Sequence, residues 1–176
     1  MQTKIAKNLM IPIEKYPQIS QSSTLKDAVR MFQQASLDIN GQKSLARALL
    51  VFDASNNLVG TVRRRDILNA LDPENLFGIQ SEYSRKLFDV KIDPNLIEIF
   101  TDSISNTINK KANLPIKEFM MPILHTVDSE DHLLKIIYEI DLNRSSMIPV
   151  SKDGVVVGVV RTVEVLKELA QILEVA

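Results

Sequence analysis

One unit of sequence occurs twice in this chain of 176 residues, and the duplication limits the possible folds more than any other feature. Three blocks recur, and they pair residues 6–12 with 116–122, 19–32 with 127–140, and 49–71 with 147–169. The separations are 110, 108 and 98 residues. The first copy therefore has two extra residues after Pro12 and ten more after its first predicted helix. We expect these extra residues in loops, where a repeat tolerates insertions.

Both copies show the same order of predicted elements, which is strand, helix, strand, strand, helix. The first helices are predicted from apolar residues at helical spacing, over residues 24–34 and 133–140. Two β-branched or apolar runs around a turn predict a hairpin in each copy, with strands at 48–52 and 58–62, and at 147–150 and 155–160. The closing helices are predicted at 64–71 and 162–173. One copy has too little sheet to cover its helices, so the predicted fold is α+β, with two pseudo-symmetric β-α-β-β-α repeats packed together.

A predicted helical insert lies between the copies. We expect the first repeat at residues 1–72, the insert at 73–114 and the second repeat at 115–176. Asp93 and Pro94 form a helix-start signature, and an apolar stripe follows at Leu96, Ile97, Phe100, Ile104 and Ile108. A shorter helix is expected around residues 83–88. The stripe needs a cover, which the repeats, a second subunit or another protein could supply.

The composition excludes several classes of function. The formal net charge is -1, without the basic excess of a nucleic-acid binder. Cysteine is absent, which excludes disulfides and thiolate chemistry and fits a cytoplasmic location. No stretch approaches the ~20 apolar residues of a membrane span. We therefore expect a cytoplasmic protein that binds neither nucleic acid nor membrane.

The sequence gives no indication of catalysis. His125 and His132 are the only histidines, and without cysteine they make no convincing metal site. A nucleophile–base arrangement, a phosphate-binding glycine loop and a dinucleotide fingerprint are all missing. The prediction is a non-enzymatic protein that requires no cofactor.

The recurring blocks resemble the cystathionine-β-synthase (CBS) domain. The family motifs are a helix ending in Met-x-Pro, an apolar Leu/Ile-Pro-Val-like strand, and Val-Gly-x-Val before a charged helix. The first copy has Met10-Ile-Pro12, Leu50-Val-Phe52 and Val59-Gly-Thr-Val62. The second has Met120-Met-Pro122, Ile148-Pro-Val150 and Val157-Gly-Val-Val160. The motifs occur twice and in the right order, over about two thirds of the chain.

The resemblance implies a pseudo-two-fold pair of domains, often called a Bateman module, with two clefts between the domains. Members commonly bind adenosine nucleotides there, and modules often form dimers. The expected function is therefore a stand-alone regulatory module that senses AMP, ADP, ATP or a related phosphorylated ligand in the cleft between the repeats. Its expected partners are a second copy, as a homodimer, and an unidentified effector protein. The alternative is a ligand-free scaffold or adaptor that acts through the central insert.

The phosphate and ribose positions of the family fall on an unusual pair of residues in each copy. In nucleotide-binding members the pattern is Gly-apolar-x-Ser/Thr-x-x-Asp, with the hydroxyl on phosphate and the Asp on ribose. Here Arg63 and Asp66 stand in the first copy, and Arg161 and Glu164 in the second. The arginines could contact phosphates, for which the guanidinium fork is suited. They could equally pair with the acids three residues on and close the clefts.

The resemblance also assigns a nucleobase pocket. Thr126 and Val127 open the second copy's first strand, where the family contacts the base, and Ile19 is the matching residue of the first copy. Ile148 and Pro149, with Leu50, would form the pocket wall. All of these except Thr126 would also be apolar in an ordinary core.

Overall fold

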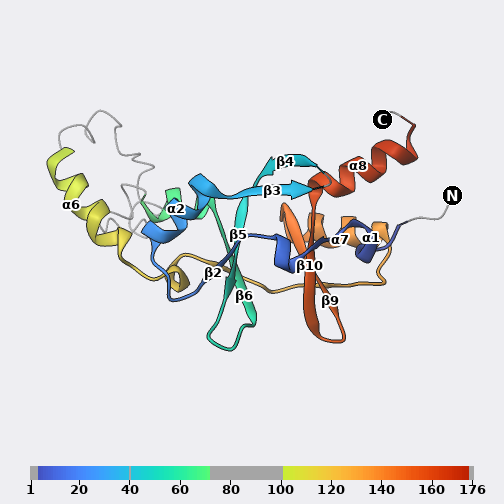
Figure 1. Ribbon diagram of the computed structural model, residues 1–176, viewed down its shortest axis with the longest axis horizontal. Coiled ribbons are helices and arrows are strands. Elements are labelled where there is room, and N and C mark those ends of the chain that lie inside the picture. The colour runs from blue at the N-terminus through green and yellow to red at the C-terminus, as the bar shows by residue number, and fades with distance from the viewer. Residues whose placement is uncertain (1–3, 40, 72–100, 175–176) are drawn as a thin grey trace, which may run out of the picture. The chain divides into compact units, whose positions relative to one another are not determined.

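The computed structural model describes residues 4–39, 41–71 and 101–174 (Figure 1). The predicted short helix at 83–88 and the stripe residues Leu96, Ile97 and Phe100 lie outside the described residues, as does the side chain of Ile104. The chain divides into two compact units. Unit 1 contains Met1–Pro17, Leu37–Ser44 and Ile123–Ala176, and unit 2 contains Gln18–Ser36 and Leu45–Pro122. Each unit therefore draws on both copies of the repeat.

Unit 2 is a four-stranded sheet with helices on one face. The strand order is β2 (Gln18–Ser20), β5 (Ala48–Phe52), β6 (Leu58–Arg63) and β7 (Met121–Pro122). β2 runs parallel to β5, and the other pairs are antiparallel. The covering helices are α2 (Leu25–Gln34), α3 (Arg64–Ala70) and the 3-10 turn η3 (Ile116–Glu118). They bury one core with the sheet, formed by Ile19, Leu25, Ala28, Phe32, Leu49, Val51, Val62, Ile67 and Ile116.

Unit 1 repeats this architecture. Its strand order is β8 (Val127–Asp128), β9 (Met147–Lys152), β10 (Val155–Arg161) and β1 (Ile11–Pro12). The covering helices are α1 (Ala6–Leu9), α7 (Leu133–Leu142) and α8 (Thr162–Ile172), and the 3-10 turn η1 (Ile13–Lys15) follows β1. The core contains Ala6, Leu9, Val127, Leu133, Ile136, Ile148, Val150, Val160 and Val165. The predicted α+β fold of two pseudo-symmetric repeats is confirmed.

The two copies exchange their Met-x-Pro segments. In unit 2, β7 of the second copy pairs with β6 of the first, and in unit 1, β1 of the first copy pairs with β10 of the second. The backbone bonds that anchor these segments are equivalent. The Ile116 N–H donates to the Ser23 carbonyl oxygen at 2.8 Å, and the Ala6 N–H donates to the Asp131 carbonyl oxygen at 2.8 Å. The exchange gives each sheet a fourth strand that its own copy does not supply.

The glycine of each Val-Gly motif permits this pairing. A Cβ on Gly60 would lie 2.8 Å from the Met121 carbonyl oxygen and 2.9 Å from the Met120 sulfur. A Cβ on Gly158 would lie 2.7 Å from the Ile11 oxygen and 2.9 Å from the Met10 sulfur. The Met-x-Pro and Val-Gly motifs are therefore packing partners, and this contact explains why the two motifs occur together.

The strand register corrects the alignment of the hairpins. Leu49 pairs with Val62 in the first copy, whereas Ile148 pairs with Val160 in the second. The two pairs are equivalent, so β5 and β9 are separated by 99 residues rather than 98, and Leu50 corresponds to Pro149. One extra residue of the first copy lies in the hairpin turn. The sequence alone could not reveal this shift, because β5 and β9 are both apolar and match equally well when one is moved by one residue against the other.

The other extra residues after the first helix do not form a plain loop. They form a second hairpin, β3 (Ser36–Ile39) and β4 (Gln42–Leu45), between α2 and β5. Leu37 of this hairpin is buried. The expectation of a loop insertion is therefore wrong here. From the predicted insert, α6 (Thr101–Ala112) belongs to unit 2 and lies against α2. None of the helices within the described ranges has the length and apolarity to cross a membrane.

Candidate functional site

The candidate site of each unit lies where a hairpin strand ends and a helix begins. Arg63 ends β6, and Asp66 is the third residue of α3. Arg161 ends β10, and Glu164 is the third residue of α8. Side chains three residues apart across a helix start lie on one face. The local fold therefore brings an arginine and an acid together twice, as the sequence pattern predicts.

The Arg63–Asp66 pair of unit 2 is closed on itself but partly open to solvent. Asp66 Oδ1 accepts from Arg63 Nη2 at 2.7 Å, and Asp66 Oδ2 accepts from Nε at 3.0 Å and from the Arg63 backbone N–H at 2.8 Å. The side chain of Arg63 is 39% exposed and that of Asp66 is 5% exposed. The bond to Asp66 raises the pKa of Arg63 above its ordinary value. A carboxylate has about four acceptor positions, so Arg63 occupies most of those on Asp66.

The Arg161–Glu164 pair of unit 1 is more enclosed. Glu164 accepts from Arg161 Nη2 at 2.6 Å and from Nε at 2.8 Å. The side chains are 5% and 11% exposed. Hydrogen bonding to Glu164 raises the pKa of Arg161. The third nitrogen, Nη1, donates to Ser44 Oγ at 3.4 Å, from β4 of the inserted hairpin. The inserted hairpin thus adds a second group, besides the Glu164 carboxylate, that holds this arginine in place.

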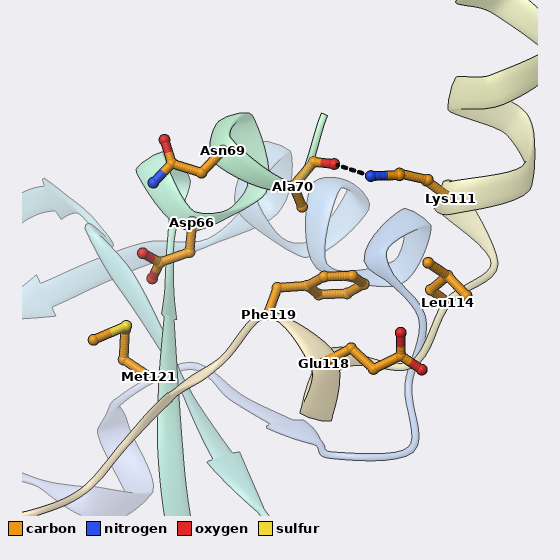
Figure 2. Close-up of a pocket in the computed structure, with 8 residues that line it drawn as sticks. All are labelled: Asp66, Asn69, Ala70, Lys111, Leu114, Glu118, Phe119 and Met121. Atoms are coloured by element: carbon orange, nitrogen blue, oxygen red, sulfur yellow. Dashed lines mark hydrogen bonds between the residues drawn. The ribbon is translucent and has the colours of Figure 1, made fainter. Parts of the chain in front are cut away.

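A cavity of about 390 Å³ adjoins Asp66 in unit 2. Figure 2 shows α3 on one side of it, and Glu118, Phe119 and Met121 on the other. Asn69, Ala70, Lys111 and Leu114 complete the lining. Lys111 of α6 donates to the Ala70 carbonyl oxygen at 3.2 Å and ties α6 to the end of α3. The volume lies within the range of small-molecule sites.

The arginine run of the first copy is engaged within unit 2. Arg63 binds Asp66, and the Arg64 guanidinium lies 5.5 Å from the centre of the Phe32 ring, within range of a cation–π contact. Among the residues that the structure describes, Arg65 alone of the three makes neither kind of contact. This use of the run favours a local structural role over recognition of a nucleic-acid backbone.

The nucleobase residues expected from the resemblance fall into three positions. Ile19, Val127 and Ile148 lie in the helix-facing cores. Leu50 and Pro149 are also buried, and because side chains alternate along a strand they lie on the opposite sheet face. Thr126 is exposed, with its Oγ1 3.4 Å from Ser151 Oγ. In the sheet of unit 1, Ile148 therefore lies on the opposite face from Pro149, and its counterpart in unit 2 is Leu49 rather than Leu50.

The ten predicted residues divide between the units. Unit 2 holds Ile19, Leu50, Arg63 and Asp66, and unit 1 holds Thr126, Val127, Ile148, Pro149, Arg161 and Glu164. Sequence reasoning missed Ser44, Lys111 and Phe119. Ser44 lies in an insertion without a counterpart in the second copy, and Phe119 looks like ordinary core. His125 and His132 belong to no group of three or more potential metal ligands in the described part of the chain.

Comparisons with known proteins agree with this architecture. The CBS-pair protein CBSX2 from Arabidopsis thaliana is 17% identical, with 99% of this chain and 100% of that chain covered and a TM-score of 0.63. A structure of CBSX2 in complex with AMP is 18% identical, with 96% of this chain and 98% of that chain covered and a TM-score of 0.62. A CBS domain-containing protein of unknown function from Bacillus anthracis str. Ames Ancestor is 16% identical, with 97% of this chain and 95% of that chain covered and a TM-score of 0.64.

No curated protein matches the chain by sequence. The family model of the CBS domain matches residues 6–73 and 116–171, which is more than half of the chain and includes both repeats. The doubled motifs, the two equivalent sheets and this match agree. The chain belongs to the CBS domain family, and it carries the domain in tandem.

Proposed function

We propose that the protein is a regulatory module that senses an adenine nucleotide, and that Arg63 and Asp66 of the first copy are its main polar contacts. The observation that carries the proposal is the partly exposed Arg63–Asp66 pair beside an open cavity. The AMP complex of the similar protein CBSX2 supports the choice of ligand class. AMP, ADP and ATP are the candidates.

The pair is suited to exchange its partners when a nucleotide binds. An arginine that turns from Asp66 to a phosphate keeps a charge-assisted bond, and the freed carboxylate can accept from ribose hydroxyls. Asp66, which is buried, and Arg63, which is partly exposed, both keep hydrogen-bond partners, which avoids the cost of leaving either one unpaired. Arg63 is long enough to contact oxygens beyond the α-phosphate, so we expect a preference for ADP or ATP over AMP.

The second copy is a poorer candidate for the same exchange. Arg161 is almost fully buried and is held by Glu164 and Ser44. Moving it would leave buried polar groups unpaired. We therefore expect one nucleotide per chain, bound through the first copy.

A regulatory role requires the ligand to favour one conformation over another. The ligand can shift such an equilibrium only by its difference in affinity for the two states. We include in the proposal that the module forms a homodimer and that the shift is transmitted to an effector protein. No catalytic role is proposed.

Calorimetry on the wild type, Arg63→Ala and Asp66→Ala tests the site with adenosine, AMP, ADP and ATP. Arg63→Ala should weaken the binding of ADP or ATP by about tenfold, because a charge-assisted hydrogen bond contributes about 1.5–3 kcal/mol. The same variant should weaken the binding of adenosine less. Asp66→Ala should weaken the binding of all four compounds. Arg65→Ala, which removes the same charge from an exposed neighbour, is the matched control and should leave affinity nearly unchanged.

A second candidate function has specific support. Both arginines pair with their own acids, as expected of a scaffold whose ligand positions are closed. If Arg63→Ala leaves nucleotide affinity unchanged or increases it, the arginine closes the site and the scaffold function is favoured. If no nucleotide binds at millimolar concentration, the sensing proposal is wrong.

A further inference from the structure

The outward face of α2 and α3 in unit 2 is basic. The two helices contact each other, and the Arg64 guanidinium over the Phe32 ring joins the start of α3 to the end of α2. Of the two acids on these helices, Asp66 is buried in its pair with Arg63, so only Asp27 offsets the positive charge. The exposed basic residues of the two helices are Lys26, Arg30, Arg64 and Arg65.

The second copy shows that the fold does not require these cations. The equivalent positions of α7 and α8 are all uncharged, and they are Leu134, Tyr138, Thr162 and Val163. Arg63, which pairs with an acid inside unit 2, does have a basic counterpart, Arg161. The arginine with an internal partner therefore occurs in both copies, whereas the cations that face solvent occur in one copy only.

The stability of the helices does not explain these cations either. Lys26 is the second residue of α2, and Arg64 and Arg65 are the first two residues of α3. The start of a helix carries a partial positive charge, so cations are unfavourable there. Three of the four cations thus lie where their own helix disfavours them, which indicates a role outside the helices.

An exposed apolar side chain lies among the basic residues. Leu68 is 68% exposed and follows Arg64 by four residues and Arg65 by three, a spacing that places the three side chains on one side of α3. An acidic segment of a protein can cover all of them, because its carboxylates bind guanidinium groups and an apolar side chain can cover Leu68.

Two other anionic partners fit the face less well. A nucleic-acid backbone offers phosphates but no apolar side chain for Leu68. A helix that lies on an anionic membrane buries a wide apolar face, whereas the outward side of α2 is polar, with Lys26, Arg30 and Gln34. The positive charge of the face also repels an identical face, which disfavours a symmetric pairing of two copies through it.

We infer that the outward face of α2 and α3 docks an acidic segment of a partner protein that carries an apolar side chain among its carboxylates. The inference rests on the effector protein included in the proposed function and assigns that effector a surface. Arg65 and Asp66 are neighbours on α3. A partner on this face and a nucleotide at Asp66 therefore contact the same short helix, through which one can influence the other.

The test measures binding of a fluorescein-labelled peptide, in which glutamates surround one leucine, to the full chain by fluorescence anisotropy. The variant Lys26→Gln, Arg65→Gln removes two exposed charges and keeps the Arg64–Phe32 contact. It should weaken peptide binding by about tenfold, or about 1.4 kcal/mol, which is within the range of two exposed ion pairs. Binding to the wild type should also weaken as the salt concentration rises.

Two further variants test the surface. Lys7→Gln, Lys152→Gln makes the same change of net charge at exposed positions of unit 1 and should leave peptide affinity unchanged. Leu68→Ser should weaken binding of this peptide more than binding of a peptide with serine in place of the leucine. Circular dichroism and thermal unfolding verify that each variant keeps the fold.

Several results would overturn the inference. They are a peptide that does not bind at millimolar concentration, and a control variant in unit 1 that weakens binding as much as the variant in unit 2. Tighter binding of an RNA oligonucleotide or of phosphatidylserine vesicles, lost in the Lys26→Gln, Arg65→Gln variant, would assign the face to a different partner. A changed oligomeric state of that variant in sedimentation would assign it to a second copy.

The peptide titration is independent of the nucleotide titration. Peptide binding without nucleotide binding would refute the sensing proposal and leave the docking surface standing. Nucleotide binding without peptide binding would do the opposite.

Discussion

The two arginine–acid pairs occupy equivalent places in the two copies and differ mainly in their access to solvent. Arg63 is 39% exposed at the side chain, whereas Arg161 is 5% exposed and also donates to Ser44. The same local motif thus forms one pair that is open to solvent and one that is enclosed. A residue of the hairpin inserted in the first copy contacts the enclosed pair of the second copy.

Truncating the two arginines should give the largest contrast. Arg161→Ala removes the buried guanidinium and leaves Glu164, which is 11% exposed at its side chain, without its partner. Breaking a largely enclosed ion pair from one side costs about 3–5 kcal/mol. Arg63→Ala should cost less, about 1 kcal/mol, because the Arg63 side chain is 39% exposed and its removal lets water reach Asp66, which also keeps the bond from the Arg63 backbone N–H. Urea denaturation measures both free energies of unfolding.

The double variant Arg161→Met, Glu164→Leu is the control, since replacing both partners by apolar residues is often nearly neutral. Equal costs for Arg63→Ala and Arg161→Ala would contradict the difference between the copies.

Nucleotide binding should stabilise the protein through the Arg63–Asp66 pair of the first copy and not through the Arg161–Glu164 pair of the second. A nucleotide at ~100 times its dissociation constant stabilises the native state by about 2.7 kcal/mol. Asp66→Ala should abolish the rise in melting temperature, and Glu164→Gln should preserve it. A calorimetric stoichiometry of two nucleotides per chain would show that the second copy is open as well.

Alanine at the two motif glycines should have similar effects in the two units. Gly60→Ala and Gly158→Ala each force a Cβ against a backbone oxygen and a methionine sulfur, and overpacking of this kind costs about 1–3 kcal/mol. Gly154 also has a left-handed backbone, with φ of 79°, but a Cβ there meets nothing within 4 Å. Gly154→Ala should therefore show only the backbone cost, about 1 kcal/mol. If only one motif glycine is sensitive to alanine, the two strand exchanges are not equivalent.

The smallest expected effect concerns the starts of the two first helices. Thr24 caps α2 and accepts from the Asp27 N–H at 3.2 Å, whereas His132 makes no side-chain cap bond on α7. Thr24→Ala should cost about 1 kcal/mol, and His132→Ala should cost little. The melting temperatures of the two variants, measured by thermal unfolding at neutral pH, compare these two stability losses.

The same cap should depend on pH. The backbone N–H of Thr24, with its hydroxyl, lowers the pKa of Asp27 below the ordinary value of 3.8. A lowered carboxyl pKa contributes stability that is complete above the ordinary value and is lost as the pH falls through the folded-state value. The stability difference between the wild type and Asp27→Asn should therefore shrink in acid. An increase of that difference in acid would contradict this sign.

Much of the fold could be predicted because the repeat doubled the signal of each element. The helices at α2 and α7 and the two main hairpins lie where apolar periodicity places them. The exchange of β1 and β7 could not be predicted from the pattern, since a two-residue strand carries no periodicity. The hairpin β3–β4 was missed because it has no counterpart in the second copy against which it could be aligned.

The candidate site was predictable only in part. Spacing alone brought Arg63 to Asp66 and Arg161 to Glu164, because these contacts are local. The contact of Ser44 with Arg161 joins residues 117 apart in sequence, and a pattern within either copy does not contain it. Burial, which separates the two pairs, likewise depends on tertiary packing rather than on the motif.

The exchanged strands set the order in which the protein can be completed on the ribosome. Unit 2 has all four of its strands once Pro122 has been synthesised. In unit 1, β1 is among the first segments made, whereas its partner β10 ends at Arg161. At ~5–20 residues per second, the apolar segment around Leu9 and Ile11 waits roughly 8–30 s for its sheet. During synthesis the apolar side chains of this segment therefore stay without their sheet for longer than those of any strand of unit 2.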